Sequence, residues 1–453
     1  MAGSEGSPAG KHVAVFAFPF ATHAAPLLSL VQRIAAASPA TAFSFFSTEK
    51  SNLACFPGGR GGEGSECPNV MAYDVWDGAP EGYVPSGTNL VEAVEIFLRA
   101  VPGNFESVLE AVERERGRKI TCLLTDGFYW FAADMARERS VPWVPVWTAS
   151  PCALLAHMET DSIRQIRGTS DMTLDAIPGL STMRMMDMIK EIFDTTAPLP
   201  TMVYRMGQVL PQAAAVVSNS FGNMDPIVER ELRSKLRRFL DVGPFVLSPP
   251  PPLSDEHGCI PWLDQQETAS VVYVSFGSMI RPPPHEVTAL VNALDKAASP
   301  FLWSYRSDAE AEVPQALLEK AAAGKRGKVV PWAPQLHVLR HRAVGAFVTH
   351  CGWNSVLESM IGGVPMVGRP FFGDQCMNAR AVEAGWRIGA AVEGGAFTEE
   401  ATAAALERVL AGEEKEGMRE RAGALKEKAL KAVEEPQGSS TKNFEALVEI
   451  VTG

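Results

Sequence analysis

The sequence lacks the features that mark several protein classes. No apolar run approaches the roughly 20 residues that a membrane-spanning helix needs. The first apolar run, from Val13 to Phe18, is short and stops at Pro19, which is typical of a strand and not of a signal peptide. The seven cysteines are scattered and form no C-x-x-C pair, so neither a zinc motif nor a redox motif is indicated. We therefore expect a cytoplasmic protein without a membrane span.

Positive charge is also scarce. Lys and Arg number 41 against 53 Asp and Glu, which gives a formal net charge of −12. A negative field repels phosphate backbones, so nucleic acid is excluded as a partner and any anionic ligand must be held by a local group. With 46% hydrophobic residues among 453, the chain is globular and has apolar material for two or three domains of about 100–200 residues.

Short apolar segments alternate with amphipathic helical segments along most of the chain. This alternation predicts parallel sheets with crossover helices, arranged as two Rossmann-like, doubly wound α/β domains that face a cleft. Four prolines in a row cannot lie in a helix or a central strand, so residues 248–252 are expected to form an extended linker. The expected strands are 12–18, 41–47, 69–75, 120–125, 143–147, 270–275, 301–306, 328–330, 345–349 and 365–367. The expected helices include 26–37, 90–114, 128–139, 284–297 and two that begin at 354 and 375.

One segment, residues 332–375, has the features of a nucleotide site. It reads WAPQLHVLRHRAVGAFVTHCGWNSVLESMIGGVPMVGRPFFGDQ. Trp332 follows a strand end, where an indole can stack on a flat base. Asn354 and Ser355 are good N-cap residues at the start of a helix, and a helix start carries about half a positive charge. The sequence therefore predicts a local anion site within an acidic protein.

Acceptor groups for sugar hydroxyls follow in the same segment. Glu358 lies one turn along the helix from Asn354, on the same face, where a carboxylate can accept hydrogen bonds from a ribose. Asp374 and Gln375 come after the next strand and offer a carboxylate and an amide. The segment thus provides groups for a base, a phosphate, a ribose and a second sugar.

This segment resembles the signature box of plant secondary-product UDP-glycosyltransferases. Other segments resemble the anthocyanidin and flavonol 3-O-glucosyltransferases, among them FPFATHAAPLL at 18–28, WTASPCALLAH at 147–157, SVVYVSFGS at 270–278 and GSSTKNF at 438–444. The resemblance implies the GT-B architecture and a division into an acceptor-binding domain (1–247), the linker (248–252), a UDP-sugar-binding domain (253–435) and a C-terminal helix (436–453) that returns to the first domain. It also implies inverting transfer of glucose from UDP-glucose to a flavonoid hydroxyl, the 3-hydroxyl of an anthocyanidin or flavonol.

The resemblance assigns a role to each site residue. His23, after the first strand, is expected to be the general base, with Asp126 as its partner carboxylate; histidine can take a proton near neutral pH. Gln375 favours glucose, because a histidine at this position often accompanies galactose in the family. UDP binding is assigned to Ser278, Trp332, Ala333, Gln335, His350, Gly352, Asn354, Ser355 and Glu358, sugar binding to Thr148, Trp353, Asp374 and Gln375, and acceptor binding to Phe20, Phe128, His157 and Phe372.

Several alternatives remain open. The same fold can use another UDP-sugar (galactose, rhamnose or a pentose) or another phenolic acceptor. A non-catalytic nucleotide-sugar-binding protein is expected to have lost His23 or Asp126, and both are present. A nicotinamide-dependent oxidoreductase needs glycines at the first strand–helix turn, which residues 18–26 lack; the G-x-G-x-x-G match at 59–64 opens no helix. Since no carboxylate cluster is evident, we expect the protein to need neither a metal nor a cofactor. We also expect it to be a monomer.

Overall fold

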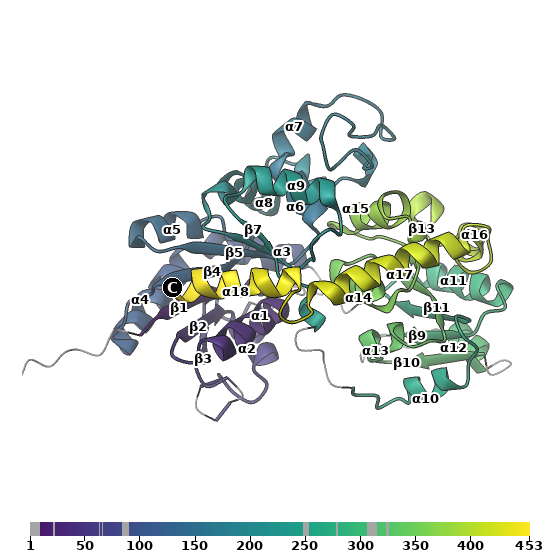
Figure 1. Cartoon of the computed structure of the whole chain (residues 1–453), viewed down its shortest axis with the longest axis horizontal. Coiled ribbons are helices and arrows are strands. Elements are labelled where there is room, and N and C mark those ends of the chain that lie inside the picture. Colours follow the sequence, from purple (N-terminus) through teal and green to yellow (C-terminus); the bar gives the residue numbers. More distant parts are fainter. Residues whose placement is uncertain are drawn as a thin grey trace, which may run out of the picture.

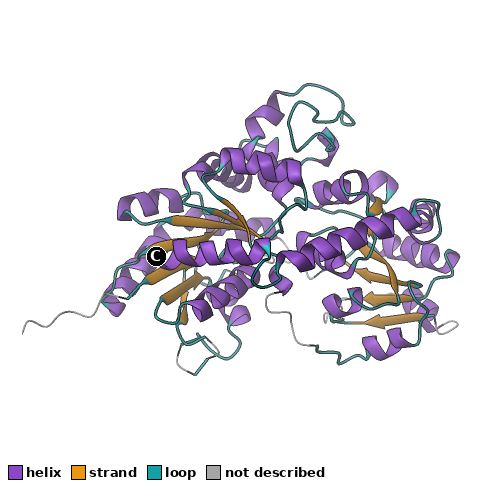
Figure 2. Cartoon of the chain, viewed as in Figure 1, coloured by secondary structure: helices purple, strands orange, loops and turns teal. Residues whose placement is uncertain are grey.

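The computed structural model describes residues 10–20, 23–62, 64–65, 67–83, 90–247, 253–277, 280–305, 315–322 and 326–453. The predicted linker at 248–252 and the predicted UDP-binding residue Ser278 lie outside the described residues. Helices cover both faces of two separate sheets, one in each half of the chain (Figures 1 and 2). The predicted α/β fold with two parallel sheets is confirmed.

The first sheet has seven parallel strands in the order β3-β2-β1-β4-β5-β6-β7. Its central strands are mostly apolar and buried along their whole length, as expected for strands with helices on both faces. The strands are β1 (His12–Phe16), β2 (Ala42–Ser47), β3 (Val70–Asp74), β4 (Cys122–Asp126), β5 (Trp143–Trp147), β6 (Val216–Ser218) and β7 (Phe239–Asp241).

Two helices of the first half differ from the prediction: the helix expected over 128–139 begins only at residue 132, and the helix expected over 90–114 is interrupted. A single helix over 90–114 is wrong: the structure has α3 (Leu90–Ala100) and α4 (Gly103–Arg116), and Pro102 is the N-cap of the second. A proline inside a helix lacks the N–H of the ladder and clashes with the preceding turn, so the helix ends before it. The other helices here are α1 (Ala24–Ala37), α2 (Glu49–Cys55), α5 (Ala132–Arg139), α6 (Pro151–Met158), α7 (Thr160–Gln165), α8 (Pro198–Val209) and α9 (Pro226–Lys235).

The second sheet has six parallel strands in the order β10-β9-β8-β11-β12-β13. Its strands are β8 (Val271–Ser275), β9 (Phe301–Ser304), β10 (Gly327–Val330), β11 (Val344–Thr349), β12 (Met366–Gly368) and β13 (Gly389–Ala391). Its helices are α10 (Cys259–Asp264), α11 (Pro284–Lys296), α12 (Gln315–Ala322), α13 (Gln335–Leu339), α14 (Trp353–Gly362), α15 (Gln375–Arg380) and α16 (Glu399–Leu410).

The last two helices connect the halves. α17 (Lys415–Ala432) lies along the second half, and α18 (Ser439–Thr452) continues from it across the first (yellow in Figure 1). Leu447 and Val451 of α18 are buried in the same apolar core as residues of β1 and β2. Asn443 donates a hydrogen bond to the backbone oxygen of Asp241, at the end of β7, over 2.9 Å. The C-terminal helix therefore packs against the first sheet.

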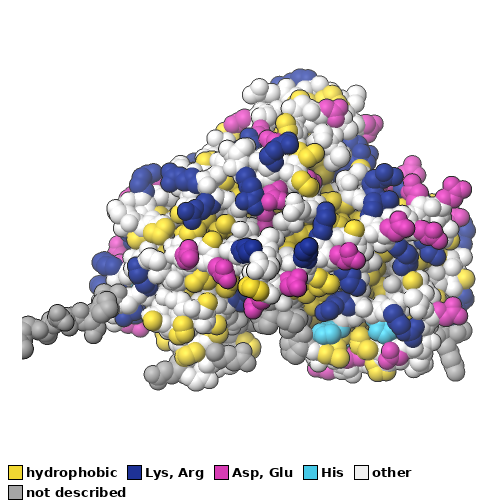
Figure 3. Space-filling view, viewed as in Figure 1, with side chains coloured by type: hydrophobic (Ala, Val, Ile, Leu, Met, Phe, Trp, Pro, Cys, Tyr) yellow, Lys and Arg dark blue, Asp and Glu magenta, His cyan; other side chains and the backbone are white. Residues whose placement is uncertain are grey.

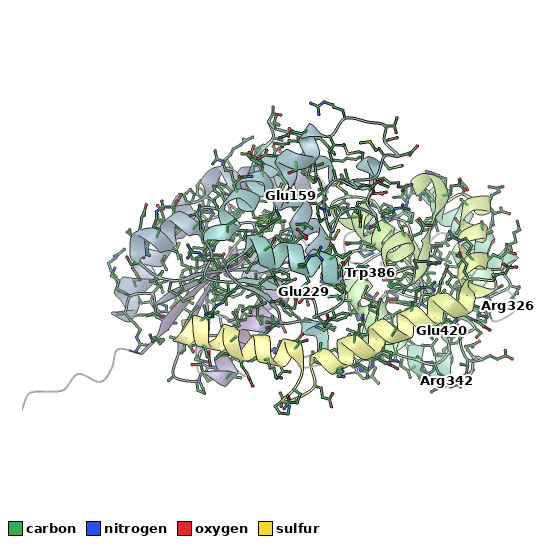
Figure 4. The ribbon with its side chains drawn as sticks, turned by 45° about the horizontal axis from the view of Figure 1, so that its top comes forward. Glu159, Glu229, Arg326, Arg342, Trp386 and Glu420 are labelled. Atoms are coloured by element: carbon green, nitrogen blue, oxygen red, sulfur yellow. The ribbon has the colours of Figure 1, made fainter. Side chains whose placement is uncertain are left out.

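A second junction lies at α15 and the residues after it. Met377 and Ala381 belong to the core of the first half although they come from the second. Trp386 packs against the cores of both halves and lies at the boundary between them (Figure 4). Arg380 donates to the backbone oxygen of Thr182 over 2.9 Å. These contacts hold α15 at a defined position relative to the first half of the chain.

The surface is mixed in charge. Side chains of both signs occur across the described face shown in Figure 3. Among the described residues, no helix combines the length and apolar character that crossing a bilayer requires.

Candidate active site

Two predicted catalytic residues meet at the carboxyl edge of the first sheet. β1 and β4 are parallel neighbours, so His23, after β1, and Asp126, the last residue of β4, end on the same side. His23 Nδ1 lies 2.8 Å from Asp126 Oδ2, with side-chain exposures of 18% and 2%. The other carboxylate oxygen accepts from the backbone N–H of Phe128 over 3.0 Å. Because an ionised carboxylate can only accept, the pair keeps the proton of His23 on Nδ1 and leaves Nε2 with a lone pair.

Aromatic rings surround this pair. The Phe128 ring lies 4.7 Å from the His23 ring, and Phe20 packs edge-on against Phe18 and Phe97. These contacts place Phe128 beside the base, whereas Phe20 is connected to it through Phe18, whose ring lies 5.3 Å from the His23 ring. Phe18 and Phe97 were not predicted as part of the site, although Phe18 ends the first apolar run of the sequence.

The other two predicted acceptor residues differ from each other. His157, in the last turn of α6, is only 4% exposed, and burial lowers its pKa to about 4, so the ring is neutral. Its Nδ1 has no hydrogen-bond partner, which is unusual for a buried polar atom and suits a site that a ligand hydroxyl completes. Phe372 is 53% exposed on the loop before α15, in the second half of the chain.

The predicted ribose-binding residues form one hydrogen-bonded cluster. Gln335, at the start of α13, donates through Nε2 to Ser355 Oγ over 3.1 Å and to Glu358 Oε2 over 2.5 Å. Tyr273 donates to Gln335 Oε1 over 3.2 Å. Burial raises the pKa of Glu358 to about 7, and the bond from Gln335 opposes this shift. The carboxylate therefore changes charge near neutral pH.

His350 occupies a narrow space between two glycines. A Cβ on Gly352 would lie 2.3 Å from its Nε2, and a Cβ on Gly277 would lie 3.0 Å from its Cε1, so neither position accepts a side chain without movement. Burial lowers the pKa of His350 to about 4, and its Nδ1 has no partner. At neutral pH it therefore offers a hydrogen bond and not a full charge.

The start of α14 differs from the sequence expectation. Asn354 and Ser355 are not N-cap residues: Gly352 is the N-cap, it makes no side-chain cap bond, and Trp353 is the first helical residue. Asn354 and Ser355 lie in the first turn instead. Without a side-chain cap, the first N–H groups of the helix are available to an anion. Of the base-binding residues, Trp332 is 58% exposed after β10, whereas Ala333 is buried.

The predicted sugar-binding residues come from both halves. Thr148, directly after β5, has its hydroxyl 3.3 Å from His23 Nδ1. Trp353 uses its indole N–H in a 2.7 Å bond to the backbone oxygen of Asn219, so its backbone N–H is the donor left for a ligand. Gln375 uses its carbonyl oxygen to accept from the backbone N–H groups of residues 371 and 372, which leaves its NH₂ group as the donor to a ligand.

Asp374 connects the two halves electrostatically. Burial raises the pKa of its carboxyl group. Hydrogen bonds from Asn378 and from the backbone of Ser150, together with the charge that His23 can carry, oppose the shift. Asp374 of the second half therefore lies within electrostatic reach of the His23–Asp126 pair of the first.

An ion pair that the sequence did not indicate supports the loop between β12 and α15. Arg369, after β12, donates to the buried Glu286 of α11 over 2.8 Å, and its guanidinium lies 3.6 Å over the Phe371 ring. The partners are 83 positions apart, so no local pattern could have indicated the pair.

The arrangement has the parts of a group-transfer site. A base with a free nitrogen stands in an aromatic setting, and a neutral histidine and a helix start lie on the facing domain. No group of three or more His, Cys, Asp or Glu side chains in the described part of the chain could hold a metal ion. The structure brings His23, Asp126, Thr148 and Asp374 close to one another, and Gln335, Ser355 and Glu358 into a second cluster.

Comparison with known proteins identifies relatives of this chain. The family model described as "UDP-glucoronosyl and UDP-glucosyl transferase" matches residues 251–429. The chain is 47% identical over 447 residues to a flavonoid 3-O-glucosyltransferase of Medicago truncatula, with 97% of each covered. It is 45% identical over 453 residues to an anthocyanidin 3-O-galactosyltransferase of Actinidia chinensis var. chinensis, covering 98% of this chain and 97% of the relative. A solved UDP-glucose: anthocyanidin 3-O-glucosyltransferase in complex with UDP aligns with a TM-score of 0.90 at 37% identity, over 97% of this chain and 98% of that one.

Proposed function

This chain belongs to the family of UDP-glucosyl and UDP-glucuronosyl transferases, and from that premise we propose that it moves glucose from UDP-glucose to the 3-hydroxyl of an anthocyanidin or flavonol. It is a UDP-glycosyltransferase with the GT-B architecture of its structural relative. The observation that carries the proposal is the 2.8 Å pair of His23 and Asp126, set among aromatic rings and within reach of Asp374 from the other half.

His23 acts as the general base in the proposed reaction. Its Nε2 takes the proton of the acceptor hydroxyl as the acceptor oxygen forms a bond to C1 of the sugar. Asp126, held by Phe128 N–H, accepts from Nδ1–H and stabilises the imidazolium that results. Because the base and the leaving group lie on opposite sides of C1, the α-linked donor yields a β-glucoside.

The leaving diphosphate is stabilised from the second half. As the C1–O bond to the phosphate breaks, the oxygen that gains charge meets His350, the amide of Asn354, the hydroxyl of Ser355 and the free N–H groups of α14. These groups perform electrostatically what a bound cation does in other transferases, and we include metal independence in the proposal. An unchanged rate after treatment with a chelator supports it, and a loss that added Mg²⁺ restores contradicts it.

The acceptor and the donor sugar follow from the same site. We place a planar flavonoid against the rings of Phe20 and Phe128, with one hydroxyl at His23 and another at the unpartnered Nδ1 of His157. Galactose is the second candidate donor, because a relative named as a galactosyltransferase is 45% identical and one named as a glucosyltransferase is 47% identical. Overall similarity does not separate the two sugars, and we assign the choice between them to Gln375.

The test uses purified protein with quercetin or cyanidin and, separately, UDP-glucose, UDP-galactose and UDP-rhamnose. Mass spectrometry and product NMR read the sugar, its anomeric configuration and the position of attachment. A β-3-O-glucoside formed chiefly from UDP-glucose supports the proposal. A main product from UDP-galactose overturns the donor, and release of UDP without a flavonoid product overturns the acceptor.

We also propose that the protein acts as a monomer in the cytoplasm. Cys55, Cys122, Cys152, Cys259, Cys351 and Cys376 form no disulfide bond, which suits a reducing compartment. Light scattering after gel filtration tests the first point, since a mass of about twice 48.8 kDa contradicts it. Microscopy of a fluorescent fusion in plant cells tests the second.

A further inference from the structure

Asn219 lies where the two halves meet. It follows β6 of the first sheet and is 3% exposed. Its backbone N–H donates to the oxygen of Trp147 over 3.1 Å, and its backbone oxygen accepts from the Trp353 indole over 2.7 Å. Its side chain accepts through Oδ1 from Phe245 N–H over 2.9 Å and donates through Nδ2 to Asn354 Oδ1 over 3.3 Å. One residue thus joins the end of β5, the chain after β7 and the start of α14.

The direction of these bonds is determined step by step. The backbone N–H of Phe245 can only donate, so the carbonyl oxygen of the Asn219 amide must face it. The NH₂ group of Asn219 is then the part that faces Asn354. Since two donors cannot pair, Asn354 turns its own oxygen toward Asn219, and its NH₂ group points away from Asn219. Amide orientations are set by such networks.

The packing leaves Asn219 little freedom. A Cβ on Gly243 would lie 2.6 Å from Asn219 Oδ1 and 2.8 Å from the backbone nitrogen of Ser220. The chain after β7 therefore passes against the amide at a distance that only glycine permits. The Asn219 side chain is confined between this segment and the first turn of α14.

We propose that Asn219 is a positioning residue for UDP: it makes Asn354 present its NH₂ group, and not its carbonyl oxygen, to the diphosphate. The inference rests on the proposed function, in which Asn354 contacts that diphosphate. An NH₂ group attracts a phosphate oxygen, whereas a carbonyl oxygen in the same place repels it. A residue of the acceptor-binding half thereby sets the polarity of a donor-binding group in the other half.

The decisive variant is Asn219→Asp. One carboxylate oxygen keeps the bond from Phe245 N–H, but the other can only accept, so Asn354 must turn its NH₂ group toward it and its oxygen toward the diphosphate. Titration calorimetry with UDP is expected to show binding weakened about 10- to 100-fold, because a bond to a charged group is exchanged for a repulsion. Asn219→Ala removes the constraint without reversing it, so a smaller loss of about 2- to 5-fold is expected.

The order of these two variants separates positioning from general support. If Asn219 only stabilised the fold, alanine would be the more harmful change, since it removes bonds that aspartate keeps. A larger loss of UDP affinity with alanine than with aspartate overturns the proposal. So does an unchanged affinity in Asn219→Asp. Melting temperatures are measured alongside, so that a loss of folded protein is recognised.

A double-mutant cycle tests whether the effect passes through Asn354. In an Asn354→Ala background, Asn219→Asp is expected to change UDP affinity by less than about threefold, because the group it reorients is gone. An undiminished effect in that background means that the carboxylate acts directly on UDP, and it overturns the proposal that Asn219 acts through Asn354.

Asn104→Asp is the matched control. Asn104 is also buried, accepts from a backbone N–H (Phe105, 2.9 Å) and donates to an oxygen (Trp76, 2.8 Å), but it lies at the start of α4. Its UDP affinity is expected to equal that of the wild type; a loss as large as in Asn219→Asp overturns the assignment to Asn219. If the wild type itself binds no UDP, the proposed function fails and the inference fails with it. If the wild type binds UDP and Asn219→Asp binds it equally well, only the positioning role of Asn219 is overturned.

Discussion

The Asp126→Asn variant tests the proposed mechanism most sharply, because it is expected to place the proton of His23 on the wrong nitrogen. The backbone N–H of Phe128 donates to Asp126 Oδ1 over 3.0 Å and can only donate. The new amide must keep its oxygen there and turn its NH₂ group to His23 Nδ1, which then has to accept. The proton of His23 moves to Nε2, the atom that should receive the proton of the acceptor. The substitution preserves the size of the side chain and the turn after β4.

The magnitude follows from the geometry. At 2.8 Å, an imidazolium and a carboxylate attract each other by about 6 kcal/mol at an effective dielectric constant near 20. Only part of this attraction counts toward catalysis, because water and the Thr148 hydroxyl replace some of it when the carboxylate is absent. General-base catalysis is worth about 10²–10⁴ in rate, which corresponds to about 3–5 kcal/mol of activation free energy. We therefore expect kcat to fall about 10²- to 10⁴-fold.

The assay separates chemistry from binding. Initial rates with UDP-glucose and quercetin give kcat, and calorimetry with UDP gives Kd, which is expected to stay within about twofold because the UDP-binding groups lie in the other half. A more acidic phenolic acceptor should lose less rate, since it needs less help from a base. A variant that keeps more than about one tenth of the wild-type kcat would refute the tautomer argument. A loss confined to Kd would place Asp126 in a different role.

Three further predictions can be checked with the same assays. His23→Ala should nearly abolish transfer and leave UDP binding intact; retained transfer would contradict its role as base. Gln375→His should move the ratio of UDP-glucose to UDP-galactose use toward galactose, because it replaces the NH₂ donor left free by the 371–372 backbone bonds, and an unchanged ratio would mean that other groups select the sugar. UDP affinity should fall as the pH drops through about 7, because the raised pKa of Glu358 lets its carboxylate protonate there and lose its capacity to accept hydrogen bonds from both ribose hydroxyls. The Glu358→Gln variant should bind UDP more weakly, and its affinity should not depend on pH. A pH-dependent affinity in this variant would assign the titration to another group.

Most of the fold could be predicted because its signals are local. The strand expected at 143–147 is observed at those residues, and β1, β4, β8 and β11 lie within two residues of their expected bounds. The long helix expected over 90–114 failed at Pro102, where apolar periodicity continued across a residue that a helix interior does not accept. The short strands β6, β7 and β13 were not predicted, because three residues carry too little periodicity.

The candidate site, like the fold, could be predicted only in part. A resemblance over 332–375 was sufficient to single out Gln335, Ser355 and Glu358, and the structure joins these three side chains in one cluster. The resemblance did not indicate what each polar atom does. Trp353 was expected to contact the sugar, yet its indole N–H is bonded to Asn219, which the sequence had not suggested. Such pairings depend on chain segments more than a hundred positions apart.

By itself, then, the sequence determined the two parallel sheets, the family and the types of residue at the donor site, because apolar periodicity and a contiguous motif are written in neighbouring positions. Only the tertiary structure decided which oxygen and which NH₂ group face the ligand. Each carboxylate and amide has several orientations open to it, and the choice is made by a backbone N–H that the fold places beside it. That N–H comes from Phe128 for Asp126 and from Phe371 for Gln375, two and four positions away, and from Phe245 for Asn219, 26 positions away. A backbone N–H can only donate, so where the fold places one, the polarity of the side chain beside it follows.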